Sequence, residues 1–236
     1  MSNVLHRMEA MARILASRLM PNECFVCGQG AGSALVCGAC RASLPRLATV
    51  CPVCAIPSGE DLICGSCQRA QPAFDATIAA LPYVFPVDRL VQALKYGRRL
   101  ALTRFLSGLL EPFTPPQGPA VVVPMPLHPG RLRERGFNQA AEIARPLARA
   151  WGLPFETAAV ERVRDTAPQA SLPWLERRRN MRGAFRCHSS FDGRTVVVVD
   201  DVMTTGATLD ELARTLKSHG AARVVNRVVA RTPSPV

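Results

Sequence analysis

The stretch from Thr195 to Thr208, T-V-V-V-V-D-D-V-M-T-T-G-A-T, constrains the fold of this chain most strongly. Its four consecutive valines, residues 196–199, predict a strand buried on both faces, because β-branched residues without polar alternation suit the centre of a parallel sheet. We expect this strand to end at Asp200 and Asp201. In open α/β sheets, ligands bind outside the carboxyl ends of the strands, so the two acids mark a candidate site.

The loop after these acids has the composition of an anion-binding site. Its members are small or hydroxylated: Thr204, Thr205, Gly206, Ala207 and Thr208. They lead into a predicted helix, where Thr208 and Glu211 have capping-box spacing and Gly220 is placed to end the helix. Backbone N–H groups and hydroxyls at a helix N-terminus suit a phosphate, whereas paired carboxylates suit sugar hydroxyls or a Mg²⁺ bound to them. Together they predict a ribose 5-phosphate site. The alternative is an ordinary β-turn-α unit.

This stretch resembles the phosphoribosyl-pyrophosphate (PRPP) signature of type I phosphoribosyltransferases. Within that superfamily the chain resembles the ComF group of competence-associated proteins. That likeness rests on L-K-Y-G-R at 94–98, V-P-M-P-L-H-P-G-R-L-R-E-R-G-F-N-Q at 123–139 and R-R-N-M-R-G-A-F at 178–185. The resemblance implies a parallel-sheet α/β domain. It also implies a Mg²⁺-dependent transferase in which an acceptor nitrogen displaces pyrophosphate from PRPP.

The resemblance also implies roles for particular residues. Asp200 and Asp201 would orient the ribose hydroxyls directly or through Mg²⁺, and residues 204–208 would hold the 5-phosphate. Lys95, Arg131 and Arg135 would neutralise the departing pyrophosphate. The arginines have a second interpretation as a solvated basic face, since charge runs usually are that. The segment 164–171, leading into 177–182, would correspond to the flexible loop that closes over PRPP.

Eight cysteines form a repeat in the first third of the chain. Two units of C-x₂-C-x₉-C-x₂-C lie 27 residues apart: Cys24, Cys27, Cys37, Cys40 and Cys51, Cys54, Cys64, Cys67. Each unit presents four thiolates to one tetrahedral ion and leaves no open position, which predicts two structural Zn²⁺. An iron–sulfur cluster is the alternative. The repeat resembles the double zinc ribbon of ComF-like proteins.

The formal charge of +11 suggests a polyanionic partner, but its distribution decides the interpretation. A Zn²⁺ held by four thiolates carries −2, so two such units lower the charge of the chain to +7. Residues 125–186 alone hold twelve Arg against six acids. Much of the basicity therefore surrounds the predicted site for a phosphorylated sugar.

We expect three parts: a helix within residues 1–21, the double zinc ribbon at 22–70, and the phosphoribosyltransferase-like domain at 71–236. The apolar patterns predict further strands at 75–81, 120–123, 157–163 and 223–230. They also predict helices at 88–95, 100–110 and 138–151, the last with a kink or break at Pro146. No apolar run approaches the roughly 20 residues of a membrane span, and we expect a cytoplasmic protein with reduced cysteines.

Two other functions remain open at this stage. The competence role of ComF relatives implies a non-catalytic factor that binds single-stranded DNA or the competence machinery. An aromatic content of 6% argues against a dedicated stacking platform for single strands. The other alternative is a PRPP-responsive regulator, because a fold does not fix a function.

Overall fold

The computed structural model describes residues 22–59, 62–165 and 181–233. The chain divides into two compact units, residues 1–44 and 45–236. The first contains one cysteine group and the short helix α2 (Gly38–Ala42). The helix predicted within residues 1–21 lies outside the described residues.

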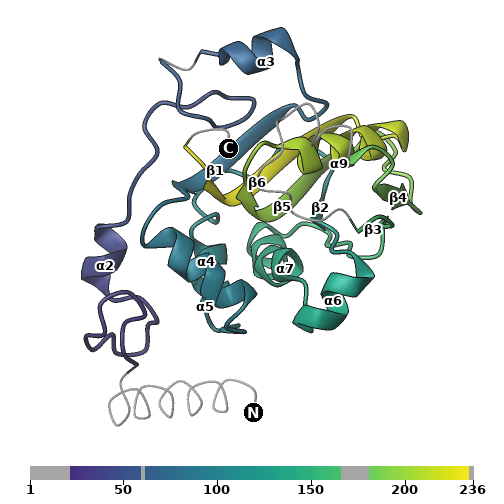
Figure 1. Cartoon of the computed structure of the whole chain (residues 1–236). Coiled ribbons are helices and arrows are strands. Elements are labelled where there is room, and N and C mark those ends of the chain that lie inside the picture. Colours follow the sequence, from purple (N-terminus) through teal and green to yellow (C-terminus); the bar gives the residue numbers. More distant parts are fainter. Residues whose placement is uncertain (1–21, 60–61, 166–180, 234–236) are drawn as a thin grey trace. The chain divides into compact units, whose positions relative to one another are not determined.

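The larger unit contains a four-stranded parallel sheet in the order β1-β6-β5-β2 (Figure 1). The strands are β1 (Ala76–Pro82), β6 (Arg223–Arg231), β5 (Thr195–Met203) and β2 (Ala120–Pro124). Every residue of β2 and the first five of β5 are buried. The burial of β5, which has β6 on one side and β2 on the other, confirms the parallel α/β sheet predicted from the valine run.

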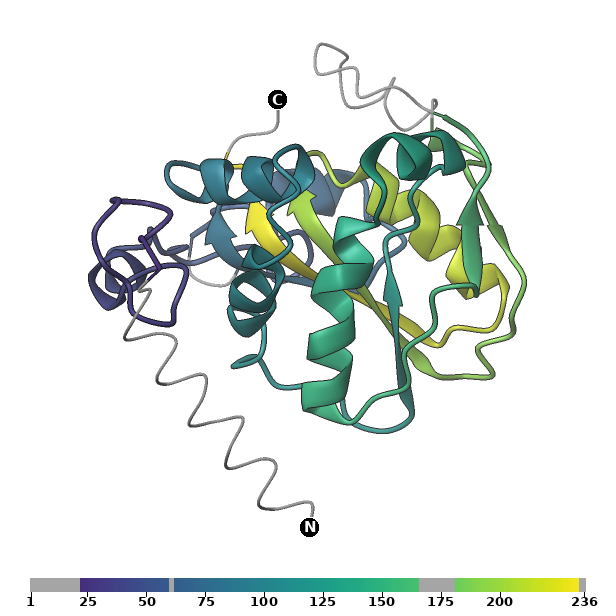
Figure 2. The same cartoon turned by 90° about the horizontal axis from the view of Figure 1, so that it is seen from below.

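Helices cover both faces of this sheet (Figures 1 and 2). Helix α9 (Ala207–Ser218) lies on one face, and α4 (Val87–Lys95), α5 (Leu102–Gly108) and α7 (Gln139–Trp151) lie on the other. Their fully buried side chains include Leu90, Leu94, Leu106, Ile143, Leu147, Leu212 and Leu216. None of the helices in the described ranges is both long and apolar enough to cross a membrane.

Helix α7 matches its predicted bounds, and it is unbroken at Pro146, where the sequence predicts a kink or a break. The Asn138 side chain caps it by accepting from the N–H groups of Ala140 (3.0 Å) and Ala141 (3.4 Å). At its other end Gly152 takes the left-handed conformation, with φ of 64°. The helix continues through Pro146 because seven buried residues along its length, Gln139 at the start among them, anchor both sides of the proline. Packing outweighs the lost hydrogen bond here.

Three further elements differ from the sequence-based expectations. A helix, α6 (Pro129–Arg135), starts after His128, whose Nδ1 accepts from the Gly130 N–H at 3.2 Å. The strand predicted at 157–163 is shorter, β3 (Val160–Arg162), and pairs antiparallel with β4 (Phe185–Cys187). The second cysteine group carries α3 (Gly65–Arg69).

The capping box predicted for α9 is wrong. Gly206, not Thr208, precedes the first helical residue, with φ of 81°. Glu211 Oε1 instead accepts from the Gly183 N–H at 2.7 Å. Gly220 follows the helix with φ of 90°, which confirms it as the glycine that ends α9.

Candidate functional site

Asp200 and Asp201 lie within β5, which runs two residues further than predicted, to Met203. The extension follows from pairing with β6, because Met203 still lies opposite Arg231. Asp201 is buried, and its Oδ2 lies 2.9 Å from Lys95 Nζ at the end of α4. Asp200 is half-buried, and its Oδ1 accepts from the Asp201 N–H at 2.9 Å. Sheet and helix thus bring together three of the residues predicted from sequence.

The two carboxylates have different electrostatic surroundings. Burial first, and then the charge of Asp201, raise the pKa of Asp200 to about 8, against the opposing effect of Lys95. Burial acts to lower the pKa of Lys95, but attraction to Asp201 and Asp200 outweighs it, so the net shift is upward. Lys95 and Asp201 thus form an ion pair beside Asp200, whose pKa is raised. A cation or hydroxyl-rich ligand there would favour the ionised form of Asp200 and lower this pKa.

The predicted phosphate loop connects β5 to α9. Its left-handed residue, Gly206, leaves little room for a side chain: a Cβ would lie 2.6 Å from Met203 Cε. The Ala207 N–H donates to Thr205 Oγ1 at 3.4 Å, and the Asp210 N–H to the Gly206 carbonyl at 2.8 Å. The loop is thereby a tight turn directly before the N-terminus of a twelve-residue helix, a position that suits an anion.

The two arginines predicted to bind pyrophosphate both lie on α6 and make contacts within the protein. Arg131 Nε is 3.8 Å from Asp165 Oδ1, a distance that permits only a weak ion pair. Arg135 donates to Gln139 and lies over the Tyr96 ring, 5.6 Å from its centroid. Since Tyr96 follows Lys95, Arg135 lies beside the end of α4. Their role toward pyrophosphate stays a prediction, as do all the binding roles assigned above.

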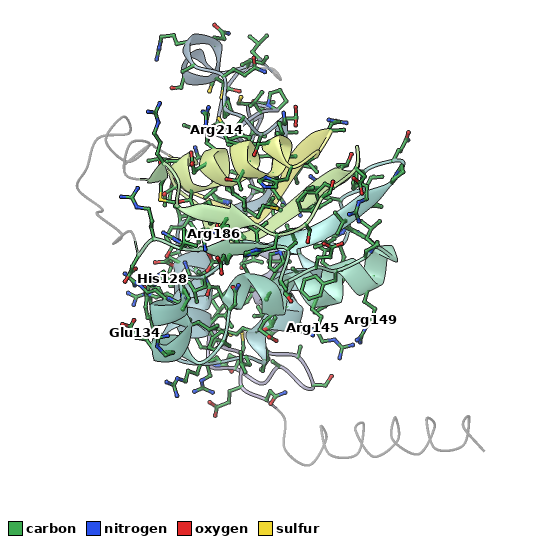
Figure 3. The ribbon with its side chains drawn as sticks, turned by 90° about the vertical axis from the view of Figure 1, so that its right-hand side faces the viewer. His128, Glu134, Arg145, Arg149, Arg186 and Arg214 are labelled. Atoms are coloured by element: carbon green, nitrogen blue, oxygen red, sulfur yellow. The ribbon has the colours of Figure 1, made fainter. Side chains whose placement is uncertain are left out.

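Two further arginines of the larger unit lie on the exposed side of a helix. Figure 3 shows Arg145 and Arg149 on α7, pointing away from the sheet. Both are exposed, and Arg145 lies over the Phe155 ring at 5.4 Å. The basic charge of the larger unit is thus only partly concentrated around Asp200.

Arg162 on β3 is a candidate that the sequence analysis missed. Burial lowers its pKa, while the charges of Asp200 and Asp165 act to raise it and that of Arg131 to lower it. The charges of Asp200, Asp165 and Arg131 on α6 therefore all influence the Arg162 guanidinium. A three-residue strand is too short for its alternation to show which residue faces inward. Most of the segment predicted to close over PRPP, residues 166–180, lies outside the described ranges.

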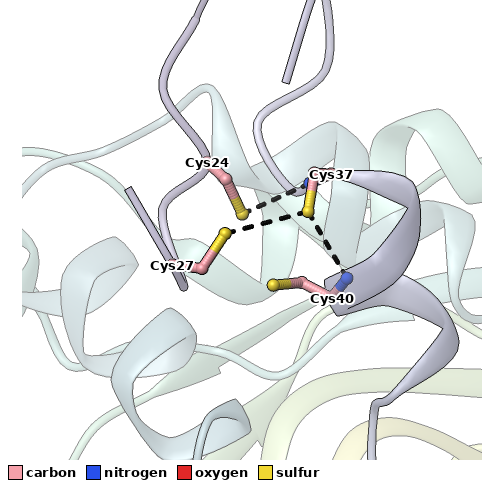
Figure 4. A group of neighbouring side chains, drawn as sticks. All are labelled: Cys24, Cys27, Cys37 and Cys40. Carbon is pink, nitrogen blue, oxygen red and sulfur yellow. Dashed lines mark hydrogen bonds between the residues drawn. The ribbon is translucent and has the colours of Figure 1, made fainter. Parts of the chain in front are cut away.

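The eight cysteines form two matching clusters. In each cluster the four Sγ atoms lie within 4.8 Å of one another, as expected for ligands of one tetrahedral ion. The Cys37 N–H donates to Cys24 Sγ at 3.3 Å, and the Cys64 N–H donates to Cys51 Sγ at 3.4 Å (Figure 4 shows the first cluster). Both donor sets fit structural zinc.

Backbone N–H groups favour thiolates at the first cysteine of each cluster. Burial acts to raise the pKa of Cys24, but N–H groups, that of Cys37 foremost, outweigh it and lower the pKa to about 6. The equivalent groups lower that of Cys51 to about 7 against the same effect of burial. Thiolates that form near neutral pH are the species that bind Zn²⁺.

Comparison with known proteins finds two family models that match parts of this chain. Residues 15–68 match the family model of the double zinc ribbon domain, and residues 133–235 match that of the phosphoribosyl transferase domain. The DNA utilization protein YhgH of Escherichia coli K12 is 36% identical over 168 residues, 68% of this chain and 74% of that protein. Competence protein F of Haemophilus influenzae is 31% identical over 164 residues, 65% of this chain and 72% of that protein.

Two further similarities are weaker. Competence protein ComFC of Bacillus subtilis is 33% identical over 111 residues, 45% of this chain and 42% of that protein. A purine phosphoribosyltransferase structure from Pyrococcus horikoshii Ot3 aligns with a TM-score of 0.30 at 18% identity, over 67% of this chain and 89% of that one. The latter score is too low to support any assignment.

Sheet, cysteine clusters and family models define a zinc-ribbon protein with a phosphoribosyl transferase domain. The sequence identity to YhgH and competence protein F, over most of the length of each, is high enough to assign the chain to their family. The chain belongs to the ComF family of competence and DNA utilization proteins.

Proposed function

We propose that this protein binds Mg·PRPP at the carboxyl end of β5 and transfers its phosphoribosyl group to an acceptor. The observation that carries the proposal is the acid pair with its lysine, placed directly before the loop at the N-terminus of α9. The match of residues 133–235 to a phosphoribosyl transferase domain supports the same conclusion.

The proposed reaction is a displacement at C1 of the ribose. An acceptor nitrogen forms a bond to C1, the bond from C1 to the pyrophosphate oxygen breaks, and pyrophosphate leaves with the electron pair. The proton released by the nitrogen passes to solvent. Asp200 and Asp201, whose carboxylate oxygens are suitable ligands for Mg²⁺, would hold the ion, which would supply positive charge to stabilise the departing pyrophosphate.

The chain's own residues would bind and orient the sugar. Asp200, in its ionised form, accepts hydrogen bonds from ribose hydroxyls, and Lys95 holds the Asp201 carboxylate in place beside it. The hydroxyls and N–H groups of residues 204–208 hold the 5-phosphate. Arg131 and Arg135 would exchange their present partners for pyrophosphate oxygens, which are stronger acceptors for a guanidinium than an amide or a distant carboxylate.

The test is to incubate the protein with Mg·PRPP and pools of nucleobases or single-stranded DNA, and to follow ³¹P NMR. We expect free pyrophosphate to appear with one pool and not when Asp200→Asn replaces the wild type. Binding of PRPP without pyrophosphate release from any pool would contradict transfer and support a PRPP-responsive regulator. Absence of PRPP binding would contradict the proposal as a whole.

A second candidate function is binding of single-stranded DNA, in line with the names of the relatives. It is favoured by two exposed aromatic side chains, Phe85 (69% exposed) and Tyr96 (73% exposed), in the same unit as exposed Arg98 and Arg99. Stacking on aromatics together with phosphate contacts is typical of such sites. Fluorescence anisotropy with a labelled oligonucleotide tests it. Salt-sensitive binding that Phe85→Ala and Tyr96→Ala weaken would support it, and binding unaffected by both would oppose it.

A further inference from the structure

The two cysteine clusters repeat each other in sequence but have different surroundings. The second cluster lies in the same compact unit as the sheet. Its Cys51, Cys54 and Cys67 are buried in one apolar core with Phe74 and Met203. The carbonyl of Pro52, between two of these cysteines, also accepts from the Thr77 N–H of β1 at 3.3 Å. The second cluster is therefore built into the domain that carries the phosphate loop.

One buried side chain connects this cluster to the loop. Arg231, at the end of β6, is 3% exposed. Its Nε donates to the Cys54 carbonyl at 2.9 Å. Its Nη1 lies 3.2 Å from the Met203 carbonyl and within hydrogen-bonding distance of the Thr204 carbonyl. A single planar guanidinium thus spans from a cysteine of the second cluster to the first residue of the phosphate loop.

The second cluster also supplies charge close to Arg231, whose Nε donates to the Cys54 carbonyl. Four thiolates around one Zn²⁺ carry −2, so a filled cluster provides the counter-charge that a buried guanidinium needs. The donor set fits this ion, since the four Sγ atoms lie within 4.8 Å of one another.

The segment that follows the second cluster also contacts the loop and its helix. The Ala73 N–H donates to Asp210 Oδ1, on the first turn of α9, at 2.6 Å. The Phe74 ring lies 3.7 Å from the point where a Cβ on Gly206 would stand. Two connections, one through β6 and one through residues 73–74, therefore link the second cluster to residues 203–210.

We propose that the metal of the second cluster positions the phosphate loop, and that Arg231 is the positioning residue between them. Loss of that metal frees the Cys54 carbonyl, so Arg231 loses a fixed acceptor and its hold on the Met203 and Thr204 carbonyls loosens. The consequence for ligand affinity rests on the proposed PRPP site, whereas the link between metal and loop does not.

The repeat provides a matched pair of variants for the test. Cys64→Ser removes a ligand of the second cluster, and Cys37→Ser removes the equivalent ligand of the first. Both cysteines are half-buried and both precede a five-residue helix. Arg231→Lys forms a third variant, which keeps the charge and removes the fork of donors. Zinc content by mass spectrometry establishes that the first two variants hold one ion and the third holds two.

Two measurements then follow on each variant. Hydrogen exchange of the amides of residues 203–208, without any ligand, is expected to be faster in Cys64→Ser and Arg231→Lys and unchanged in Cys37→Ser. Calorimetry with ribose 5-phosphate is expected to show affinity about fivefold or more weaker in the same two variants, the lower range of typical coupling between sites. Pyrophosphate, which would not use this loop, is expected to bind all the variants alike and controls for general unfolding.

A further measurement on the wild type avoids variants that fold poorly. Coupling between two sites is reciprocal, so ribose 5-phosphate is expected to raise the affinity for one zinc ion by a similar factor, measured by equilibrium competition with a chelator, and to leave the affinity for the other unchanged. Equal exchange in Cys64→Ser and Cys37→Ser, or in Arg231→Lys and wild type, would overturn the inference. If the wild type binds no ribose 5-phosphate, the proposed function fails, and hydrogen exchange still decides the link.

Discussion

At the residue scale, Asp200 and Asp201 are adjacent in the sequence but have different electrostatic roles. Asp201 forms a buried ion pair with Lys95, while burial and the charge of Asp201 raise the pKa of Asp200 to about 8. Two adjacent acids can share a site in this way because one partner takes the cation and the other keeps a proton. A ligand with hydroxyls or Mg²⁺ would reverse that balance at Asp200.

The first prediction concerns pH and Asp200. Its pKa is about 8 in the folded protein against an ordinary 3.8, so between these values the folded state holds a proton that the unfolded state has lost. The contribution of Asp200 to stability therefore falls as pH rises from about 4 to 8, and levels off above that. Urea denaturation of wild type and Asp200→Asn at several pH values measures it. We expect the free energy of unfolding of Asp200→Asn to rise relative to that of the wild type as pH increases over this range. A difference that stays constant with pH would contradict a raised pKa of Asp200.

The second prediction concerns the Lys95–Asp201 pair. Lys95→Met leaves a carboxylate that is 3% exposed without its cation, and we expect a loss of about 3 kcal/mol in the free energy of unfolding. Adding Asp201→Asn to this variant should recover most of the loss. Lys217→Met is the control, because its partner Asp75 is 31% exposed and such pairs contribute less than about 1 kcal/mol. Equal losses of unfolding free energy in both lysine variants would show that the buried Asp201 carboxylate does not need Lys95 as its cation.

At the element scale, β5, its loop and α9 form the unit around which the site is built. The valine run predicts β5 because four consecutive β-branched residues have no other favourable environment than a buried strand. The end of β5 and the cap of α9 depended on contacts that the local sequence does not show. Pairing of Met203 with Arg231 extends the strand. The Glu211 carboxylate, which local spacing assigned to a capping box, instead accepts from the N–H of Gly183, 28 residues earlier.

The candidate site likewise has residues that the local sequence predicts and residues that only the tertiary structure reveals. Asp200, Asp201 and residues 204–208 could be predicted because they are contiguous and have a characteristic order. Lys95 could be predicted only because it lies in L-K-Y-G-R, one of the stretches that resemble the ComF group. Its pairing with Asp201 depends on how α4 packs against the sheet. Arg162 and Arg231 have no local signal, since both act through contacts with residues distant in the sequence.

The third prediction concerns the turn at Gly206. Gly206→Ala places a Cβ on a left-handed residue (φ of 81°) and 2.6 Å from the end of the Met203 side chain. Because that methionine can move, we expect the backbone cost to dominate, about 1–2 kcal/mol in the free energy of unfolding. PRPP affinity should fall as well. Gly108→Ala, where a Cβ meets nothing within 4 Å, is the control and should not lose stability. The interpretation fails if both alanines have the same effect.

At the scale of the whole molecule, the chain combines two metal clusters with one α/β domain. The contacts divide it between Leu44 and Pro45, so the two halves of the sequence repeat belong to different units. The boundary that the sequence suggests at residues 70–71 follows the repeat, whereas the second cluster shares its apolar core with the sheet. The repeat therefore shows where metal binds but not which unit each cluster stabilises.

The fourth prediction is the metal content. We expect two zinc ions per chain, with Cys24→Ser and Cys51→Ser each retaining one, because each cluster closes on its own four cysteines. Elemental analysis of the purified proteins measures this. Iron in place of zinc, or the loss of both ions in either variant, would contradict two independent structural sites.

The central claim is that Mg·PRPP binds at the carboxyl end of β5, and calorimetric titration of Mg·PRPP tests it most directly. We expect the wild type to bind, omission of Mg²⁺ to weaken binding, and Asp200→Asn to bind about 10- to 100-fold more weakly with little response to Mg²⁺. Asp192→Asn, at an exposed acid outside the site, should bind like the wild type. Equal affinity of wild type and Asp200→Asn, with and without Mg²⁺, would contradict binding of Mg·PRPP at this end of β5.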